Sequence, residues 1–380
     1  MRKLKLMTIV ETRQEIIRLS AIIKRCDKYF GHVLALIKHN NDDEPDQAFF
    51  EDLGLRAPDF CIEASGEDTG ETMGSIVSKT YRLMAEVKPD ALMISGGANS
   101  CLSAIGAKRL RIPVFRLEAS NSCFGGTLTE ETNRRIVDAV ADVNLCYSEH
   151  ARRCLNAQGV PRERIYVTGS PMAEVLHANI DRIKSSDILE KLGLNKGEYI
   201  LLSAHREENI GIDDNFFSLM SAVNTMAVKY DMPIVYSCHP RSGRLIEQRH
   251  FTFDRRVIRH RPFGFHDYNK LQMNAFAVVS DSETLPEESS FFLSTGNPIP
   301  AVCIRTSIEH PEALDKGSFI LAGIKAEQVL QAIDMAVKMN AEGDLDLPVD
   351  DYTEKNASAR VVKIIQGYAG IVNSMDLGKN

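Results

Sequence analysis

The fold is decided by residues 6–26, which read LMTIVETRQEIIRLSAIIKRC. The apolar run Leu6–Val10 predicts a buried strand, and Glu15–Cys26 carries apolar residues at the spacing of a helix. The alternation continues, with strands expected at Val33–Ile37, Ala91–Ile94 and Val114–Leu117 and helices at Thr72–Glu86 and Ser100–Lys108. Strands that alternate with helices predict a parallel sheet covered by helices on both faces.

A second series of the same kind follows the break Gly169-Ser170-Pro171. Strands are expected at Tyr199–Ser203, Ile234–Ser237, Val278–Ser280 and Ala301–Ile304, and a helix at Phe216–Tyr230. A chain of 380 residues also suits two domains better than one. We therefore predict an α/β protein with two doubly wound, Rossmann-like domains facing a cleft, residues 1–168 and 169–355. Residues 356–380 are expected to form a helix that packs back on the first domain.

The composition argues against several classes of protein. A net charge of −7 and a pI near 5.9 disfavour a nucleic-acid partner, because phosphate backbones require a concentrated basic surface. No apolar run reaches the roughly 18 residues that a membrane helix needs. The start of the chain does not resemble a secretory signal, so a cytoplasmic location is expected. Eight cysteines with no CxxC pair predict reduced thiols and no metal site.

Several predicted strands end in polar residues. In an open parallel sheet, ligands bind beyond the carboxyl ends of the strands. The most polar strand ends are Glu11-Thr12-Arg13, Ser95–Ser100, Glu118–Asn121, His205–Asn209 and Asp281–Thr284. A helix that begins at such an end suits a phosphate group, to which Arg13 and Arg206 would add bidentate contacts. The sequence contains no GxGxxG and no GxxxxGK[ST] motif, which weakens dehydrogenase and NTPase interpretations.

Four residues are candidates for acid–base chemistry, namely Glu118, Glu130, Glu131 and His205. A carboxyl or imidazole group in a closed cleft can have its pKa tuned toward neutrality. Glu130 and Glu131 also have a simpler interpretation. Both residues would lie in the first turn of a helix, Thr129–Val140, where their charges interact favourably with the helix dipole. Thr129 would be the cap of this helix.

Other polar and aromatic residues have two interpretations each. His239 follows a strand and is a candidate to face the cleft, and Phe265 either stacks on a base or caps the domain. The basic run from Arg255 to Arg261 is interpreted as a solvated edge rather than a binding patch.

At these segments the chain resembles the non-hydrolysing UDP-N-acetylglucosamine 2-epimerase family over nearly its whole length. The motifs that carry the resemblance are Met7–Arg13, Pro89-Asp90-Ala91, Asn99–Ile105, Glu130–Arg134, Ser203–Asn209 and Gly264–Tyr268. Within the family, the chain is most similar to the branch that forms UDP-N-acetyl-L-fucosamine from UDP-2-acetamido-2,6-dideoxy-L-talose in capsule and O-antigen synthesis.

The resemblance implies a GT-B-like arrangement of two domains in a homodimer that needs no metal and no cofactor. The N-terminal domain would then hold the sugar and the catalytic groups, and the C-terminal domain would hold UDP. The implied chemistry removes the C2 proton, expels UDP to leave a glycal, and adds UDP back with inverted C2 configuration. Two alternatives remain, a catalytically impaired homologue that binds a nucleotide-sugar or partners an active epimerase, and a GT-B-like glycosyltransferase.

The resemblance also assigns roles to individual residues. Glu118, Glu130 and His205 match catalytic positions. Positions for the UDP-sugar substrate are matched by Arg13, His205, Arg206, Ser282 and Glu288, with His239, Phe265, Thr284 and Glu309 as further candidates. Glu309 and Glu312 fall where the family has Glu-Arg-Pro-Glu.

The departures from the family pattern concentrate in the same motifs. Glu11 stands where the family has glycine, Gly97 where it has a catalytic aspartate, and Glu283 where it has glycine at the diphosphate site. Further departures are Ser120 for glycine, Ser122 and Thr127 for arginine, His310 for arginine, and the loss of two tyrosines from a regulatory segment at His39–Glu44. A basic residue would have to offset the Glu283 charge, and the candidates are Lys38, Arg116 and Arg305.

Overall fold

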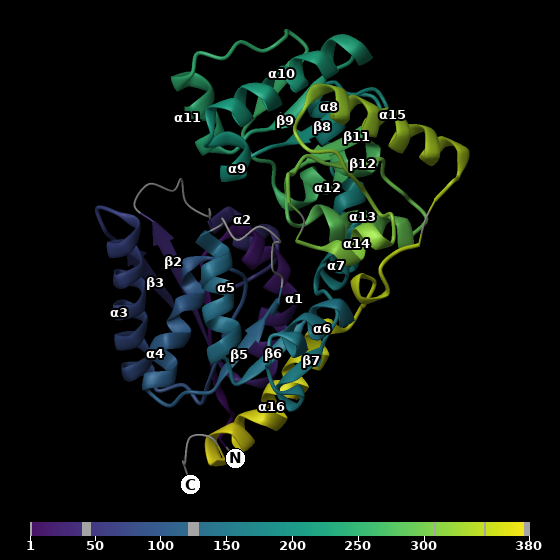
Figure 1. Cartoon of the computed structure of the whole chain (residues 1–380). Helices are drawn as coiled ribbons and strands as arrows, with labels where there is room; N and C mark the ends of the chain where they lie inside the picture. Colours follow the sequence, from purple (N-terminus) through teal and green to yellow (C-terminus); the bar gives the residue numbers. More distant parts are fainter. Residues whose placement is uncertain (1, 40–46, 121–128, 308, 346, 376–380) are drawn as a thin grey trace. The chain divides into compact units, whose positions relative to one another are not determined.

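A computed structural model describes residues 2–39, 47–120, 129–307, 309–345 and 347–375. The chain divides into two compact units. Unit 1 comprises Met1–Val175 and Glu354–Asn380, and unit 2 comprises Leu176–Thr353. Figure 1 shows their elements in sequence colours. Among the described residues, no helix has the length and apolar character needed to cross a bilayer.

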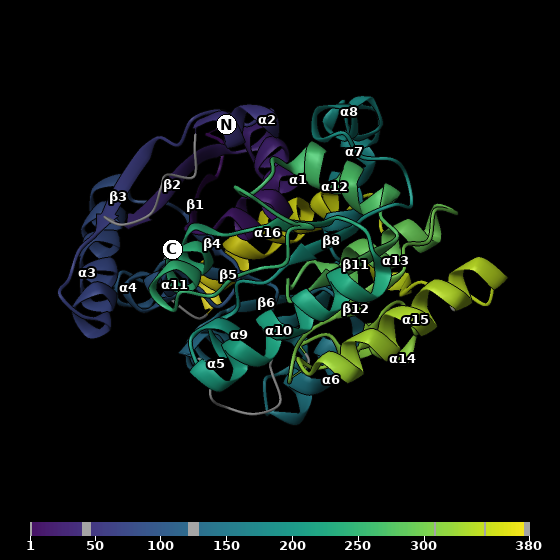
Figure 2. The ribbon, with the colours of Figure 1, turned by 90° about the horizontal axis from the view of Figure 1, so that it is seen from above.

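Unit 1 contains a seven-stranded parallel sheet among its described residues, in the order β3-β2-β1-β4-β5-β6-β7. Its strands are β1 (Lys5–Val10), β2 (Gly31–His39), β3 (Phe60–Ala64), β4 (Ala91–Ile94), β5 (Val114–Leu117), β6 (Val143–Cys146) and β7 (Ile165–Val167). Its helices are α1 (Arg13–Tyr29), α2 (Gln47–Asp52), α3 (Thr69–Val87), α4 (Ser103–Arg109), α5 (Thr129–Val140), α6 (Glu149–Ala157) and α16 (Ala357–Met375), with 3-10 turns η1 (Asn99–Leu102) and η2 (Arg162–Arg164). In Figures 1 and 2, α3, α4 and α5 cover one face of this sheet and α1 and α16 the other.

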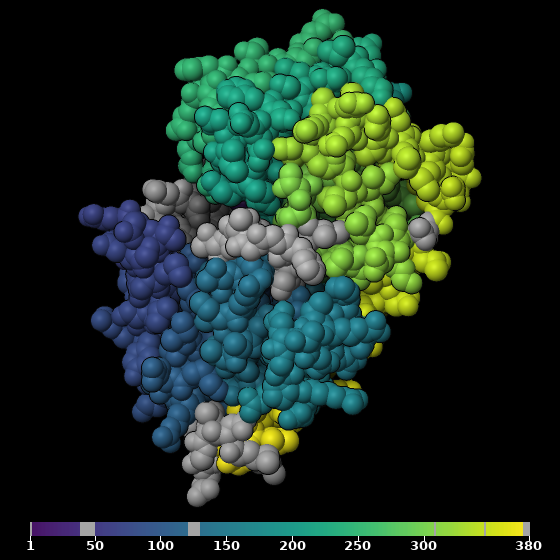
Figure 3. Space-filling model, viewed as in Figure 1, coloured from purple at the N-terminus to yellow at the C-terminus, as the bar shows by residue number. Residues whose placement is uncertain are grey.

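Unit 2 contains a six-stranded parallel sheet in the order β10-β9-β8-β11-β12-β13, again among the described residues. Its strands are β8 (Ile200–Ser203), β9 (Ile234–Ser237), β10 (Val257–His260), β11 (Ala277–Ser280), β12 (Ala301–Cys303) and β13 (Ile320–Leu321). Its helices are α8 (Ile188–Leu192), α9 (Glu207–Ile210), α10 (Asp213–Tyr230), α11 (Pro240–Gln248), α12 (Phe265–Asn274), α13 (Leu285–Ser294), α14 (Pro311–Asp315) and α15 (Ala326–Glu342), with the 3-10 turn η3 (Asp350–Tyr352). Helix α15 lies at the surface, in yellow-green in Figure 3.

The central strands are buried on both faces, as the sequence predicts for parallel sheets. Every residue of β4, β5, β8 and β11 is buried. In unit 2, Ile200 and Leu202 pack with α10 and α15, whereas Tyr199 and Leu201 face α8 and α12, because successive side chains of a strand point to opposite faces. Both strand orders follow the Rossmann pattern, so the predicted fold class of two parallel, doubly wound α/β domains is confirmed.

Helix α7 (Met172–Ser185) crosses from one unit to the other. The units therefore divide after Val175, inside this helix, whereas the sequence-based boundary was placed at residue 168. The second division, after Thr353, precedes α16, which contacts α1 within unit 1. Glu174 fixes the start of α16, because its carboxylate accepts hydrogen bonds from the Ser358 backbone N–H at 2.9 Å and hydroxyl at 2.6 Å.

The strands that the sequence did not predict are short or polar. Strand β6 contains the buried Asn144, and β10 is the edge strand of its sheet, with Ile258 and Arg259 exposed. The basic run Arg255–Arg261 thus lies at an exposed edge of the sheet, since β10 lies within it.

Candidate active site

Each sheet has a switch point between two adjacent strands from which the chain winds in opposite directions. In unit 1 these strands are β1 and β4, and in unit 2 they are β8 and β11. Ligands of doubly wound sheets bind beyond the carboxyl ends of the strands at such a point. The polar segments that the sequence singles out follow these four strands and their neighbours.

Thr12 begins helix α1 directly after β1 through a capping box. The Glu15 backbone N–H donates to Thr12 Oγ1 at 3.2 Å, and the Glu15 carboxyl accepts from the N–H groups of Thr12 at 3.1 Å and Glu11 at 2.7 Å. Burial, with a smaller contribution from the Glu11 charge, raises the pKa of Glu15 to about 8. Glu15 is therefore largely protonated at neutral pH. Arg13, the first residue of α1, is half-buried.

Glu118 lies at the end of β5 in a buried ion pair. Its Oε1 is 2.8 Å from Arg18 Nη1, and each side chain is only 2% exposed. Ser95 Oγ donates to Glu118 Oε2 at 3.4 Å. Glu118 also has a positive φ of 59°, a backbone conformation that is costly for a residue with a Cβ. The surrounding structure thus holds this carboxylate rigidly beside a cation.

Glu130 is in the first turn of α5, where the sequence places it, and its side chain is 44% exposed. Its Oε2 is 3.5 Å from Arg134 Nη2, one helical turn further along. The same two residues pack against Gly97, since a Cβ at Gly97 would lie 2.7 Å from Arg134 Nε and 3.1 Å from Glu130 Cβ. Asn133 donates to the Gly97 carbonyl at 3.1 Å. Helix α5 thus fills the space that a side chain at position 97 would need.

Glu11 reaches the loop that follows the neighbouring strand β4. Its Oε2 accepts a hydrogen bond from the Ser100 backbone N–H at 2.5 Å, in the first turn of η1. The Ser100 hydroxyl also lies 3.4 Å from Glu15 Oε1. Glu11, Glu15 and Ser100 therefore connect the two strand ends of the switch point.

Ser120 has a φ of 61°, in the region that glycine favours. Its N–H donates to Asp138 Oδ2 at 3.1 Å, and Asp138 is also paired with the buried Arg116. Arg116 donates to the Gly96 carbonyl at 2.6 Å. This network holds the turn after β5 in a left-handed conformation although the residue is serine.

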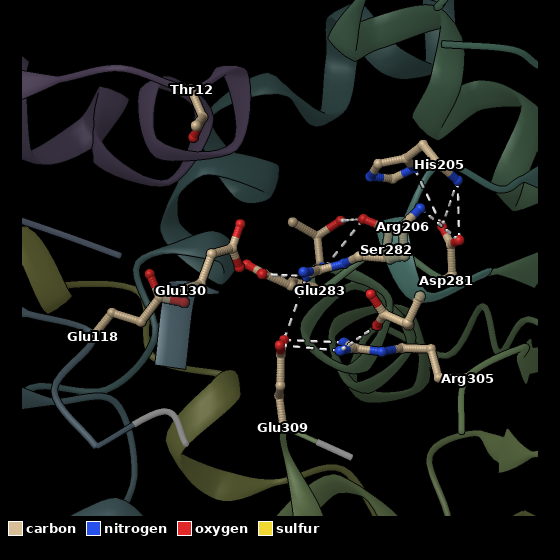
Figure 4. Close-up of polar contacts among 12 residues, drawn as sticks. Thr12, Glu118, Glu130, His205, Arg206, Asp281, Ser282, Glu283, Arg305 and Glu309 are labelled. Carbon is tan, nitrogen blue, oxygen red and sulfur yellow. Dashed lines mark hydrogen bonds and ion pairs between the residues drawn. The ribbon is translucent and has the colours of Figure 1, made fainter. Parts of the chain in front are cut away.

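Asp281 organises the switch point of unit 2 (Figure 4). This buried carboxylate accepts from the N–H groups of His205 at 2.9 Å and Arg206 at 3.0 Å, and from Asn209 Nδ2 at 3.0 Å. The His205 ring contributes Nδ1 at 3.2 Å from Asp281 Oδ1. A carboxylate beside one ring nitrogen fixes the orientation of the imidazole, which suits His205 to proton transfer through the other nitrogen.

Arg206 lies in an ion-pair network with three other charged residues (Figure 4). Its Nη2 contacts Glu283 Oε1 and lies 3.4 Å from Glu309 Oε2. Arg305 binds the same Glu309 carboxylate through two contacts of 3.0 Å. Arg206 thus provides a compensating charge for Glu283, in addition to the expected candidates Lys38, Arg116 and Arg305. Arg116 pairs with Asp138 in unit 1, and Arg305 pairs with Glu309, which also contacts Arg206.

Ser282 and Thr284 form the turn that starts α13. Their hydroxyls lie 3.0 Å apart, and the Thr284 N–H donates to Ser282 Oγ at 3.3 Å. Glu288, one turn into α13, is 5% exposed and accepts from Gln272 Nε2 at 2.6 Å. The turn places hydroxyls at a helix N-terminus, which is a suitable environment for an anionic group.

Two remaining candidates in unit 2 also begin helices. His239 is the N-cap of α11, its Nδ1 accepting from the Arg241 N–H at 3.3 Å, and its ring centre is 6.1 Å from that of His205. Phe265 is the first residue of α12 and is 4% exposed.

His310 stands where the family has arginine and forms a compact buried cluster. Its Nδ1 lies 2.7 Å from Tyr352 Oη, which donates to Glu312 Oε1 at 2.5 Å. Burial opposes ionisation of Glu312, but its hydrogen bonds with His310 and Tyr352 prevail and lower its pKa to about 2. This cluster ties the segment after Glu309 to η3.

Other sequence-based assignments fall outside the described residues. These are Ser122, Thr127 and most of the regulatory segment, from residue 40 onward. Sequence reasoning assigned no role to three residues that contact candidate site residues. Arg18 pairs with Glu118, Arg134 packs against Gly97, and Asp281 lies beside the His205 ring. A signal existed for Arg18, since it interrupts the apolar face of α1 between Ile16 and Ile22 and is buried there.

Comparison with known proteins identifies the family. The family model described as UDP-N-acetylglucosamine 2-epimerase matches residues 24–366. The chain belongs to this family. The structure of UDP-N-acetylglucosamine 2-epimerase from Rickettsia bellii is 38% identical and matches with a TM-score of 0.89 over 100% of both chains.

Less similar relatives also align with nearly the whole chain. The UDP-N-acetylglucosamine 2-epimerase of Methanococcus maripaludis is 27% identical, covering 94% of this chain and 97% of that protein. A UDP-2,3-diacetamido-2,3-dideoxy-D-glucuronate 2-epimerase of Pseudomonas aeruginosa is 25% identical, covering 95% of this chain and 99% of that protein. The sequence-based family resemblance is thus confirmed, and relatives of nearly equal similarity are named for different sugars.

Proposed function

We propose that the protein is a UDP-N-acetylhexosamine 2-epimerase that supplies a precursor for surface polysaccharides. Its substrate would be UDP-2-acetamido-2,6-dideoxy-L-talose, giving UDP-N-acetyl-L-fucosamine, or the pair UDP-N-acetylglucosamine and UDP-N-acetylmannosamine. The observation that carries the proposal is the position of Arg13, Glu118, Glu130, His205 and Arg206. Arg13, Glu118, His205 and Arg206 lie within three residues of the ends of β1, β5 and β8, and Glu130 lies in the first turn of α5, in a chain that belongs to the 2-epimerase family.

The proposed reaction is an anti elimination followed by re-addition. A base takes the C2 proton, the bond from C1 to the phosphate oxygen breaks, and UDP leaves with the electron pair to give a glycal. The same oxygen then adds back to C1 while an acid returns a proton to C2 on the opposite face. The residues must therefore supply a base, an acid and cationic contacts for the leaving diphosphate.

Unit 2 has the groups for the leaving diphosphate. Arg206 follows β8, and Ser282 and Thr284 stand at the N-terminus of α13, where backbone N–H groups and the helix dipole favour an anion. Glu288, held by Gln272, is a carboxylate suited to accept hydrogen bonds from ribose hydroxyls. Unit 1 has the carboxylates for proton transfer.

One specific observation favours a second candidate function, a nucleotide-sugar binder or partner subunit without turnover. It is the combination of Gly97, whose Cβ space is filled, and Glu283, which engages Arg206. Gly97 provides no carboxylate, and Glu283 occupies an arginine that a diphosphate would need.

The family resemblance further predicts a homodimer in the cytoplasm. Analytical ultracentrifugation would measure the oligomeric state, and cell fractionation would measure the location.

Calorimetric titration with UDP tests the proposal, because the leaving group of an epimerase must bind. Binding in the micromolar range, with UDP competing against the UDP-sugar, is the expected result. Binding of UDP-sugars without formation of a second epimer would favour the nucleotide-sugar binder. Absence of any UDP binding by correctly folded protein would contradict both.

A further inference from the structure

The carboxyl groups around the switch point of unit 1 differ in how far they reach solvent. Glu15 is 4% exposed, and the Glu118 side chain is 2% exposed beside Arg18. Glu130 is 44% exposed, and Glu11 is half-buried. A general base must come within hydrogen-bond distance of the proton that it removes. Glu11 and Glu130 are therefore better placed to meet a substrate than the two buried carboxyl groups.

The position of Glu11 follows from the pairing of two adjacent strands. Thr8 of β1 is level with Met93 of β4, so three residues further along each chain Glu11 is level with Gly96. The hydrogen bond from the Ser100 N–H to Glu11 Oε2 shows that the side chain crosses to the β4 loop. The carboxylate of Glu11 thus lies against the same loop that contains Gly97.

A side chain at position 97 would require Arg134 of α5 to move. A Cβ there would meet Arg134 Nε at 2.7 Å and Arg134 Cγ at 3.0 Å, both shorter than ordinary contacts. Glu130 Cβ lies beside Gly97, and the Glu11 carboxylate accepts a hydrogen bond from the Ser100 N–H of the same loop. The residue that follows β1 thus provides a carboxylate to this loop, whereas position 97 provides none.

We infer that Glu11 is a catalytic residue of the proposed epimerisation, providing from β1 the carboxylate that the β4 loop lacks at Gly97. The inference rests on the proposed function. In the elimination step, the Glu11 carboxylate forms a bond to the C2 proton as the C2–H bond breaks. That electron pair becomes the C1=C2 double bond, and the C1–O pair leaves with UDP. Glu130, in the first turn of α5 beside Gly97, returns a proton to C2 during re-addition.

The neighbours of Glu11 hold it in place for this role. The Ser100 N–H donates to Oε2 at 2.5 Å and so fixes the carboxylate against the β4 loop. The Glu11 backbone is anchored by the Glu15 carboxyl at 2.7 Å. Because burial raises the pKa of Glu15 to about 8, Glu15 stays largely neutral at pH 7 and adds little negative charge beside the base.

Glu11→Gln tests the assignment because glutamine has nearly the same shape. Its amide oxygen can still accept the Ser100 N–H, but it cannot take a proton. We expect kcat and the exchange of the C2 proton with solvent to fall by roughly 10² or more. The dissociation constant for UDP and the urea unfolding midpoint should stay close to those of wild type. Glu86→Gln, on the exposed side of α3, is the matched control and should match wild type in every measurement.

Three outcomes separate the possibilities. Loss of kcat in Glu11→Gln with UDP binding retained, and partial recovery in Glu11→Asp, would support the role in proton transfer. A Glu11→Gln enzyme with kcat within a few fold of wild type would overturn it, and so would equal losses in kcat and stability, which indicate a structural role. Wild-type protein that binds UDP but leaves all tested UDP-sugars unchanged would overturn the proposed function and this assignment with it.

Discussion

Glu283 engages the guanidinium of Arg206 at the switch point of unit 2. The two side chains are 14% and 11% exposed, and Glu309 lies 3.4 Å from the same guanidinium nitrogen. Arg206 is thus already neutralised by the protein. A diphosphate that binds at the start of α13 must displace or tolerate the Glu283 carboxylate. Glu283 therefore competes with the diphosphate for Arg206.

The first prediction concerns that competition. Glu283→Gln removes the negative charge while keeping the size, so one fewer carboxylate competes with the diphosphate for Arg206. We expect UDP to bind roughly 10- to 100-fold more tightly, equivalent to about 1.4–2.7 kcal/mol. Calorimetric titration measures this, with the exposed Glu190→Gln as the control in the same unit. Unchanged or weaker UDP binding in Glu283→Gln would show that the carboxylate does not compete.

The second prediction concerns Gly97. Introducing aspartate there forces its Cβ against Arg134 and Glu130 of α5, so Gly97→Asp should lower the free energy of unfolding by about 1–3 kcal/mol. Combining it with Arg134→Ala should recover part of that loss. Urea denaturation measures both. Gly74→Asp, where an added Cβ has no atom within 4 Å, controls for the general cost of replacing glycine. Equal effects at positions 74 and 97 would refute the steric explanation.

The third prediction concerns the backbone of Ser120. Its φ of 61° is costly for serine and free for glycine, so Ser120→Gly should raise the free energy of unfolding by about 1 kcal/mol. Ser120→Ala keeps the Cβ and should bring no such gain. If alanine stabilised the protein as much as glycine, the strain would not lie in the backbone.

The fourth prediction concerns pH. The pKa of Glu15 is raised from 4.5 to about 8 by burial first and by Glu11 second, so the folded state binds a proton that the unfolded state loses above pH 4.5. The stability from this proton is fully present below pH 4.5 and is lost as the pH rises toward 8. Glu15→Gln, which resembles the protonated form, should therefore gain stability relative to wild type between pH 5 and 8. Parallel unfolding profiles for the two proteins would contradict this.

The sequence predicts the central strands of both sheets because they are continuous apolar runs. Ala91–Ile94 and Ile234–Ser237 occur where expected. Strand β6 was missed because Asn144 interrupts its apolar pattern. The Asn144 Nδ2 group donates to the Asp138 carbonyl at 3.2 Å, a contact that no local pattern reveals. Edge strand β10 was missed because solvent, not the core, covers much of it.

The site was predictable where it depends on position along a strand. Residues that follow β1, β4, β8 and β11 meet at the switch points, as the strand order requires. The pairs that decide charge and space were not predictable, because they join distant parts of the chain. Arg18 and Glu118 are 100 residues apart, and Arg206 and Glu309 are 103 apart. Such pairs form only when the complete fold brings distant elements together, so local sequence patterns do not predict them.

The most direct test of the central claim is proton NMR of each candidate UDP-sugar incubated with the wild-type protein in deuterium oxide. The account predicts that the C2 proton signal disappears as deuterium enters, and that the C2 epimer accumulates to equilibrium. A C2 signal that keeps its full intensity in every candidate sugar, while an active member of the family exchanges it under the same conditions, would contradict the claim that this chain is a 2-epimerase.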